Sequence, residues 1–287
     1  MPVSEHLVFK GGTSLSKGWN LIERFSEDID LAIDRKFLGF EGYLSNKQVK
    51  KLRKASCEFI SNDFIKNIRQ KIKELEIPDV TLTIQDFKDS DTDPLVVELI
   101  YKSLTDESPY LNPRVLIEVG ARSLMEPSEK RGIQSLVGSH FADQNFADKL
   151  FLIPTILPKR TFLEKAFLLH EEFQKPITQI RIDRLSRHLY DLDKLMNTQH
   201  EKDALNDLEL YKTIITHRQK FNTVRGIDYA NHQPEKIDFV PPNGIIKQWK
   251  SDYVAMQENM IYGESESFEN LIKNIEELKE RFRKIGI

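Results

Sequence analysis

Alternating apolar and polar positions at the start of the chain predict a strand, a turn, a short helix and a second strand. Residues 7–9 are a run of strand-favouring side chains, and Gly11-Gly12 interrupts this run. Thr13 can cap a short helix that extends to about residue 17. Between residues 28 and 33 every second side chain is apolar, which is the period-two pattern of a strand with one apolar face.

The next stretch predicts a long helix followed by three strands. Apolar residues recur three or four positions apart through residues 45–76, with a break expected near Ser61-Asn62, and Pro78 ends the pattern. Strand candidates then follow at Val80–Phe87, Leu95–Leu104 and Arg114–Gly120. Successive strands with tight connections favour an antiparallel or mixed sheet.

The composition of the chain changes near residue 150. Pro154 and Pro158 indicate a short linker, and a loop is expected at residues 223–243. Five helices are predicted in this half: Phe162–Gln174, Arg181–Asn197, Lys202–Val224, Gly244–Tyr262 and Ser265–Ile287. We therefore expect an α+β core domain with a mixed sheet over residues 1–152, followed by a helical bundle over residues 153–287.

Bulk composition excludes several classes of protein. The 287 residues are 39% hydrophobic and 30% charged, with a net charge of −3, so a nucleic-acid partner would need a local basic patch. Cys57 is the single cysteine, which excludes an intrachain disulfide framework. No apolar run is long enough to span a bilayer, and no secretory signal is evident. We expect a cytoplasmic protein with no membrane partner.

Asp28 and Asp30 are the first candidates for chemistry. They lie two positions apart on a predicted strand, so their side chains point to the same face with Cα atoms roughly 6–7 Å apart. Two ionised carboxylates on one face repel each other, and a divalent cation removes that repulsion. An Asp-x-Asp pair alone is more often part of a surface turn, so neighbouring segments must decide whether this pair indicates a metal site.

The Gly-Gly turn supplies such a neighbour. Glycines let the backbone approach a ligand closely, and the N–H groups that begin the next helix favour an anion. Thr13 and Ser14 add hydroxyl donors. One segment thus suits phosphates, and the following strand suits the cation that accompanies them, which is the combination that phosphoryl or nucleotidyl transfer needs.

The stretch FKGGTSL at residues 9–15, followed by RFSEDIDL at residues 24–31, resembles the AbiEii-type family of nucleotidyltransferases. These enzymes are the toxins of abortive-infection toxin–antitoxin pairs and belong to the polymerase-β-like superfamily. The resemblance implies a third carboxylate on a later strand, a role that Glu118 fits, with Asp28, Asp30 and Glu118 together as catalytic residues holding one or two Mg²⁺ ions.

The resemblance also implies residues that bind the nucleotide. Lys165 would contact the triphosphate of the NTP substrate and Asp191 would orient Lys165, although Asp191 could equally pair with Arg187 one helical turn earlier. His188 stands where the family often has Asp. The implied nucleotide-binding set is Gly11, Gly12, Thr13, Ser14, Ser26, Lys165 and Asp191.

The acceptor is expected to be RNA, by resemblance the 3′ end of a tRNA, and the protein partner an antitoxin. Residues 46–76 carry nine basic and four acidic side chains, a local excess of +5 that could meet RNA phosphates or could be a solvated helix face. Two alternatives remain open. One is a nucleotidyltransferase that modifies a small molecule, and the other is a nucleotide-binding or interaction module with the same fold and little turnover.

Overall fold

The computed structural model describes residues 2–104, 110–222 and 224–286, and these residues form two compact units. Unit 1 comprises residues 1–19 and 26–156, and unit 2 comprises residues 20–25 and 157–287. The division expected at residue 152 differs from this arrangement in two respects. The first unit continues to residue 156, and a hexapeptide near the N-terminus groups with the second unit.

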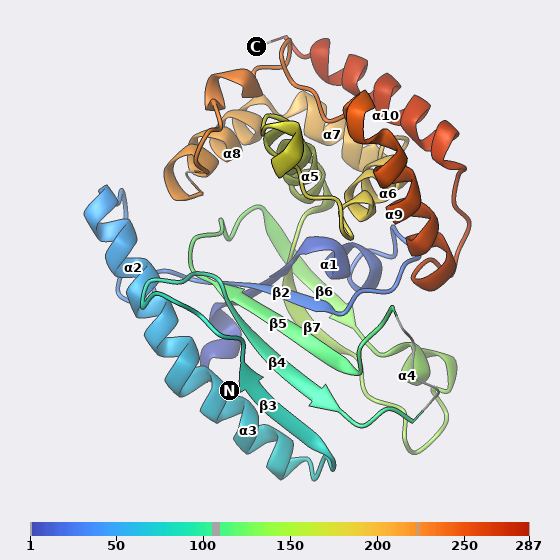
Figure 1. Ribbon diagram of the computed structural model, residues 1–287. Helices are drawn as coiled ribbons and strands as arrows, with labels where there is room; N and C mark the ends of the chain where they lie inside the picture. The colour runs from blue at the N-terminus through green and yellow to red at the C-terminus, as the bar shows by residue number, and fades with distance from the viewer. Residues whose placement is uncertain (1, 105–109, 223, 287) are drawn as a thin grey trace. The chain divides into compact units, whose positions relative to one another are not determined.

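Unit 1 is built on a seven-stranded mixed sheet with the strand order β3-β4-β5-β2-β1-β7-β6 (Figure 1). Strands β1 and β2 are antiparallel, β2 and β5 are parallel, and β1 and β7 are parallel. The neighbours β3 and β4, β4 and β5, and β6 and β7 are antiparallel. The strands are β1 (Leu7–Lys10), β2 (Asp28–Ile33), β3 (Val80–Ile84), β4 (Leu95–Tyr101), β5 (Arg114–Gly120), β6 (Ser128–Ile133) and β7 (Phe151–Ile156).

The five expected strands are present, and two further strands were missed. Strand β6 has the polar sequence SEKRGI and lies at the sheet edge, so it lacks the apolar alternation that marks a half-buried strand. Pro154 was interpreted as part of a linker, but it lies inside β7, opposite Lys130 of β6. The prediction of a linker there was wrong because pairing between distant segments formed a strand around the proline.

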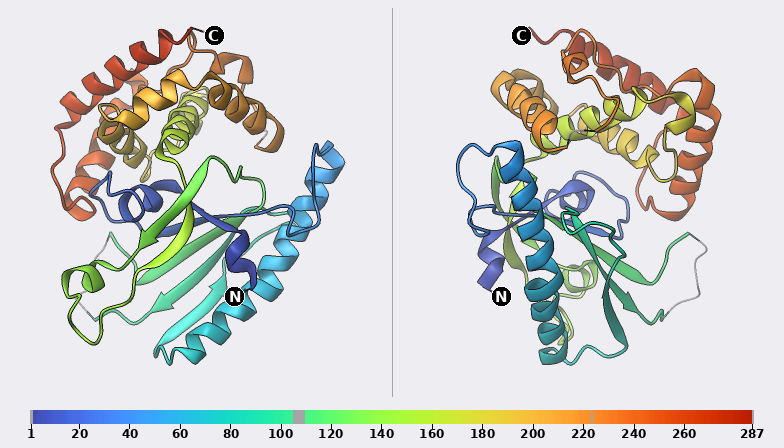
Figure 2. Two further views of the ribbon diagram at one scale, coloured as in Figure 1. Left: turned by 180° about the vertical axis from the view of Figure 1, so that it is seen from behind. Right: turned by 60° about the vertical axis from the view of Figure 1, so that its left-hand side comes forward.

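The helices of unit 1 begin with a 3-10 helix at Pro2–His6 and α1 (Gly11–Lys17), which connects β1 towards β2. Helix α2 (Asn46–Phe59) passes through a π turn (Ile60–Phe64) into α3 (Ile65–Glu74). The two helices form one long rod beside the sheet (Figures 1 and 2). The predicted break at Ser61-Asn62 coincides with the π turn. A short helix α4 (Leu136–His140) follows β6.

Unit 2 is formed largely by helices. These are α5 (Pro158–Phe173), α6 (Ser186–Leu195), α7 (Gln199–Asn206), α8 (Leu208–Phe221), α9 (Ile246–Asn259) and α10 (Phe268–Arg283), with 3-10 turns at Ile177–Gln179, Tyr229–His232 and Asn243–Ile245. One expected helix, Lys202–Val224, is two helices, because Asp207 leaves the helical conformation and caps α8 by accepting a hydrogen bond from the Leu210 N–H. Thr223 and Ile287, within the expected loop and last helix, lie outside the described residues.

Each unit encloses its own apolar core. In unit 1, Leu15, Ile33 and Val97 are fully buried, and in unit 2, Phe162, Leu189 and Trp249 are fully buried. Within the described part of the chain, no helix is both long and apolar enough to cross a membrane.

Candidate functional site

Three charged side chains occupy one row across the centre of the unit 1 sheet. Asp30 on β2 pairs in register with Lys10 on β1 and with Glu118 on β5, so all three project from the same face. The Lys10 ammonium lies 3.8 Å from Asp30 Oδ1 and 4.0 Å from Glu118 Oε1. Their side chains are 18%, 21% and 39% exposed, which leaves the row open to solvent at its Glu118 end.

Asp28 and Gly11 lie beside this row. Asp28 lies two residues before Asp30 on β2, on the same face, and pairs in register with Leu116. Gly11 has φ +75°, and a Cβ atom at this position would lie 2.0 Å from Asp30 Oδ2. The first glycine of the turn is therefore needed both for its backbone conformation and for the closeness of the Asp30 carboxylate.

The hydroxyl groups of the Gly-Gly-Thr-Ser turn donate to backbone carbonyls in this structure. Thr13 Oγ1 donates to the Asp28 carbonyl, and Ser14 Oγ donates to the Gly11 carbonyl at 2.8 Å. Thr13 is almost fully buried and Ser14 fully buried. These bonds fasten α1 to the start of β2. Phosphate binding by Gly11, Gly12, Thr13, Ser14 and the half-buried Ser26 stays a prediction.

The oxygen donors of Asp28, Asp30 and Glu118 fit Mg²⁺ in their chemistry, but not in their spacing. Three carboxylates from two adjacent parallel strands share one face, and Mg²⁺ prefers oxygen ligands of this kind. Among the described residues, however, no three acidic, histidine or cysteine side chains are drawn together closely enough to form a metal centre. The Lys10 ammonium lies against two of the three carboxylates and supplies part of the positive charge that a metal ion would bring.

Lys165 and Asp191 meet in the interior of unit 2. Lys165 Nζ lies 2.7 Å from Asp191 Oδ2, and the side chains are 7% and 0% exposed. Arg24 adds two hydrogen bonds to the same carboxylate, from Nε to Oδ1 and from Nη2 to Oδ2, each 2.7 Å long. Burial by itself would raise the pKa of Asp191, but the two cations hold it well below its usual range.

His188 is the other neighbour of Lys165. Its Nδ1 lies 3.3 Å from Lys165 Nζ. Burial, followed by the nearby Lys165 charge, lowers the pKa of His188 well below its ordinary value. A neutral imidazole can accept a hydrogen bond at Nδ1 from the ammonium. The residue that departs from the family pattern thus holds Lys165 without adding a charge.

Two residues of these clusters carried no role in the sequence prediction. Lys10 and Arg24 both lie inside the stretches that resemble the family, but each pairs with side chains that no local pattern identifies. The partners of Lys10 are Asp30 and Glu118, which follow it in the sequence by 20 and 108 positions. The partner of Arg24 is Asp191, which follows it by 167 positions. The only local signal for Arg24 was its place four residues before Asp28.

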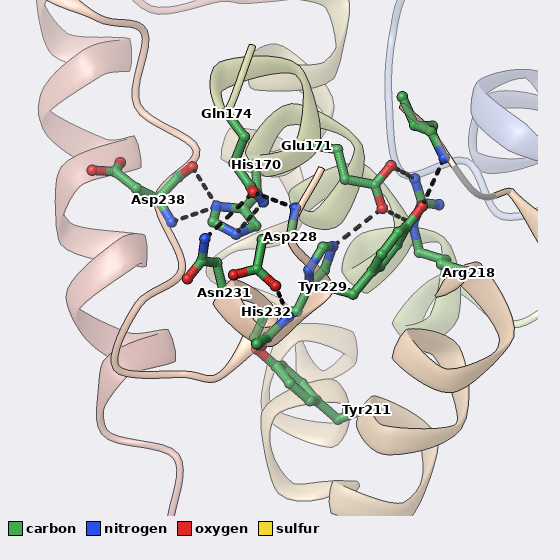
Figure 3. Close-up of polar contacts among 12 residues, drawn as sticks. His170, Glu171, Gln174, Tyr211, Arg218, Asp228, Tyr229, Asn231, His232 and Asp238 are labelled. Atoms are coloured by element: carbon green, nitrogen blue, oxygen red, sulfur yellow. Dashed lines mark hydrogen bonds and ion pairs between the residues drawn. The ribbon is translucent and has the colours of Figure 1, made fainter. Parts of the chain in front are cut away.

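A second polar network in unit 2 fastens residues 228–238 to α5 and α8 (Figure 3). Glu171 accepts two hydrogen bonds of 2.6 Å from Arg218 and lies 3.1 Å from His232 Nε2. The Asp238 backbone N–H donates to His170 Nδ1 at 3.0 Å. Burial alone would raise the pKa of Glu171, yet the bonds from Arg218 and His232 lower it. The network serves the architecture of unit 2.

Comparison with known protein families places residues 2–277 in the family described as "Nucleotidyl transferase AbiEii toxin, Type IV TA system". This is the family that the Gly-Gly and Asp-x-Asp stretches resemble, so that prediction is confirmed. A search of individual curated proteins found no match to the chain.

Proposed function

Because the chain belongs to the AbiEii family of nucleotidyl transferase toxins of type IV toxin–antitoxin systems, we propose that it transfers a nucleoside monophosphate from an NTP to an RNA acceptor, such as the 3′ end of a tRNA. The observation that carries this proposal is the alignment of Asp28, Asp30 and Glu118 on one face of adjacent strands, next to the Gly-Gly turn. The expected site of action is the cytoplasm, where NTPs and tRNA are found, and the expected protein partner is an antitoxin.

In the proposed reaction, a hydroxyl oxygen of the acceptor attacks the α-phosphorus of the NTP. The bond from that phosphorus to the β-phosphate oxygen breaks, and pyrophosphate leaves. The Glu118 carboxylate takes the proton of the attacking hydroxyl. When bound by Asp28, Asp30 and Glu118, Mg²⁺ supplies charge neutralisation at the attacking and leaving oxygens.

The start of α1 is assigned to the phosphates. The first N–H groups of a helix have no carbonyl partner within that helix, and here they include those of Gly11 and Gly12, with which α1 begins beside Asp30. Since the Thr13 and Ser14 hydroxyls donate to the main chain, the backbone N–H groups are better suited to this task. Lys165, oriented by Asp191, is proposed to contact the triphosphate.

In the direct test, the purified protein is incubated with Mg²⁺, total tRNA and each α-labelled NTP in turn, and transfer of the label to tRNA is measured. Transfer of label to tRNA by the wild-type protein, and its loss in Asp30→Asn, is the expected result. Asp86→Asn is the matched control, because Asp86 is an exposed carboxylate of the same unit. Transfer that survives in Asp30→Asn would overturn the assignment of this site.

Transfer of the label to a small molecule instead of tRNA would identify the alternative enzyme, a nucleotidyltransferase that modifies a small molecule. NTP binding with no acceptor labelled under any condition would favour the interaction module.

A further inference from the structure

A row of basic side chains follows one side of the helical rod α2–α3. We propose that this row, which we call the basic stripe, binds the sugar-phosphate backbone of the RNA acceptor, an inference that rests on the proposed function and assigns its partner surface. Its members come from both helices, on either side of the π turn: Lys47, Lys50, Lys51, Lys54, Lys66, Arg69 and Lys73.

The π turn keeps the two halves of the stripe on one side. Lys47 and Lys54 are seven residues apart, about two α-helical turns, and the same spacing separates Lys66 from Lys73. Twelve residues separate Lys54 from Lys66, which in an uninterrupted α-helix would place them about 120° apart around the axis. The π turn at Ile60–Phe64 accommodates one extra residue, and this reduces the offset to about 20°.

The opposite side of the rod is buried, so the lysines of the stripe face away from the core, whereas the exposed Arg69 also donates a hydrogen bond of 3.4 Å to the Leu82 carbonyl of β3. Leu52, Ile60 and Phe64 are at most 3% exposed, whereas every member of the stripe is exposed. Ser56 Oγ donates to the buried carboxylate of Asp93 at 2.8 Å, and Asp93 also accepts from the Ala121 N–H at 3.0 Å. The segments just before β4 and just after β5 therefore orient α2 around its axis.

The lysines of the stripe carry charge that the rest of the described chain does not neutralise. None of its six lysines forms an ion pair with a carboxylate of the described residues, whereas Arg53 pairs with Asp91 and Lys71 with Glu74 on other sides of the rod. Glu58 and Asp63 are the acidic residues between the two halves. On a chain with a net charge of −3, this is a local concentration of positive charge.

The length of the stripe decides between a small anion and a polymer. The 29 residues from Asn46 to Glu74 extend over about 40 Å at a rise of about 1.5 Å per residue, far beyond the size of one phosphate group. The long side chains are lysines with one arginine, and the nearby Phe59 packs against Phe37 and Phe64 rather than facing outward as a stacking platform. The stripe therefore suits repeated phosphates, read without base sequence.

The test compares two variants with equal loss of charge. In the first, Lys47, Lys50, Lys51 and Lys54 are changed to Gln. In the matched control, four exposed lysines of the same unit that are not part of the two rod helices are changed to Gln: Lys36, Lys88, Lys130 and Lys149. Binding of fluorescent tRNA is measured between 50 and 200 mM salt, and transfer of label from NTP is measured at limiting tRNA.

The stripe variant is expected to lose about tenfold or more in tRNA affinity, and its slope of log K against log salt should fall by up to about four, since each phosphate contact contributes close to one. Its KM for tRNA should rise while its KM for NTP is unchanged. The control variant should keep most of the wild-type affinity and slope. The Glu58→Gln variant, which removes a negative charge from the rod, should bind tRNA more tightly than wild type.

Equal losses in both four-residue variants, or no loss in either, would overturn the inference. Binding of poly-glutamate to the stripe without binding of tRNA would also overturn the inference, and would favour an acidic protein as the partner. Failure of the proposed function would give a different result. In that case the wild-type protein would label no acceptor RNA, whether or not tRNA binds to the stripe. If wild type labels tRNA and the stripe variant labels it equally well at limiting tRNA, this inference alone is contradicted and the proposed function is not.

Discussion

The Arg24 guanidinium and the Asp191 carboxylate form a two-bonded ion pair, with both N–H···O distances 2.7 Å and both side chains buried. The same carboxylate accepts from Lys165. One anion thereby balances two buried cations and fixes the position of Lys165, the lysine proposed to contact the NTP. The stability of unit 2 and the placement of Lys165 consequently depend on a residue that precedes Asp28 by only four positions.

Removal of the Asp191 charge should be costly. In Asp191→Asn, Arg24 and Lys165 remain buried without their anion, and loss of one partner of a buried pair costs about 3–5 kcal/mol. Arg24→Lys keeps the positive charge but cannot form both hydrogen bonds of the guanidinium group, so a smaller loss of stability is expected. Urea unfolding measures both, with Arg283→Lys in the exposed pair with Glu280 as the control, which should change stability by less than about 1 kcal/mol. Equal stabilities in all three variants would contradict this account.

Stability should fall as the pH drops below about 6.5, the ordinary pKa of histidine. Burial and the Lys165 charge lower the pKa of His188, and burial lowers the pKa of His170. Between the ordinary and the lowered pKa, the unfolded chain binds a proton that the folded chain does not, so the free energy of unfolding decreases with falling pH by up to about 1.4 kcal/mol per pH unit for each histidine.

The His188→Asn variant tests this pH dependence. The amide can still accept a hydrogen bond from Lys165, but it cannot bind a proton at these pH values. Unfolding free energies measured between pH 5 and 7 should change less steeply in this variant than in wild type. The same change at the exposed His140 should leave the wild-type slope intact. A slope that does not differ between wild type and His188→Asn would exclude His188 as a source.

Gly11→Ala should impair both folding and transfer. The substitution meets a positive φ and places a methyl group against Asp30 Oδ2, so the strand face must shift. We expect a stability loss of about 1–3 kcal/mol and a large loss of activity. Gly39→Ala is the matched control, because Gly39 has φ +83° but no atom within 4 Å of the added methyl group. If the two variants lose activity equally, the closeness of Asp30 has no functional meaning.

Lys10→Met should strengthen Mg²⁺ binding. The ammonium near Asp30 and Glu118 repels an incoming cation. Two unit charges about 4 Å apart interact by about 1 kcal/mol in water and by more at partly buried side chains such as these, so the gain in affinity is on the order of fivefold or more. Calorimetric titration with Mg²⁺ measures this directly, and the Mg²⁺-dependent rise in Tm gives an independent reading. Lys36→Met, at an exposed lysine, should leave the Mg²⁺ affinity unchanged. Weaker binding in Lys10→Met would instead indicate that Lys10 supports the carboxylate arrangement.

Local patterns predicted the parts of the fold that repeat along the backbone. The alternation at residues 28–33 predicted β2, and the spacing of apolar residues predicted the rod of α2 and α3 together with its interruption. Strands β6 and β7 escaped prediction because one is a polar edge strand and the other contains Pro154. Their conformation depends on each other and on β1, so it could not be recognised in either segment alone.

The sequence by itself determined the spacing of Asp28 and Asp30, the glycine turn before them and the apolar face that keeps their strand in the sheet, because backbone periodicity and steric limits act over a few residues. Tertiary structure alone decided that Lys10 and Glu118 flank Asp30, that Arg24 pairs with Asp191 and that a π turn aligns the lysines of two helices. These relationships arise when distant segments close on one another, and the partner of a charge is then set by which segments share a sheet row or a core.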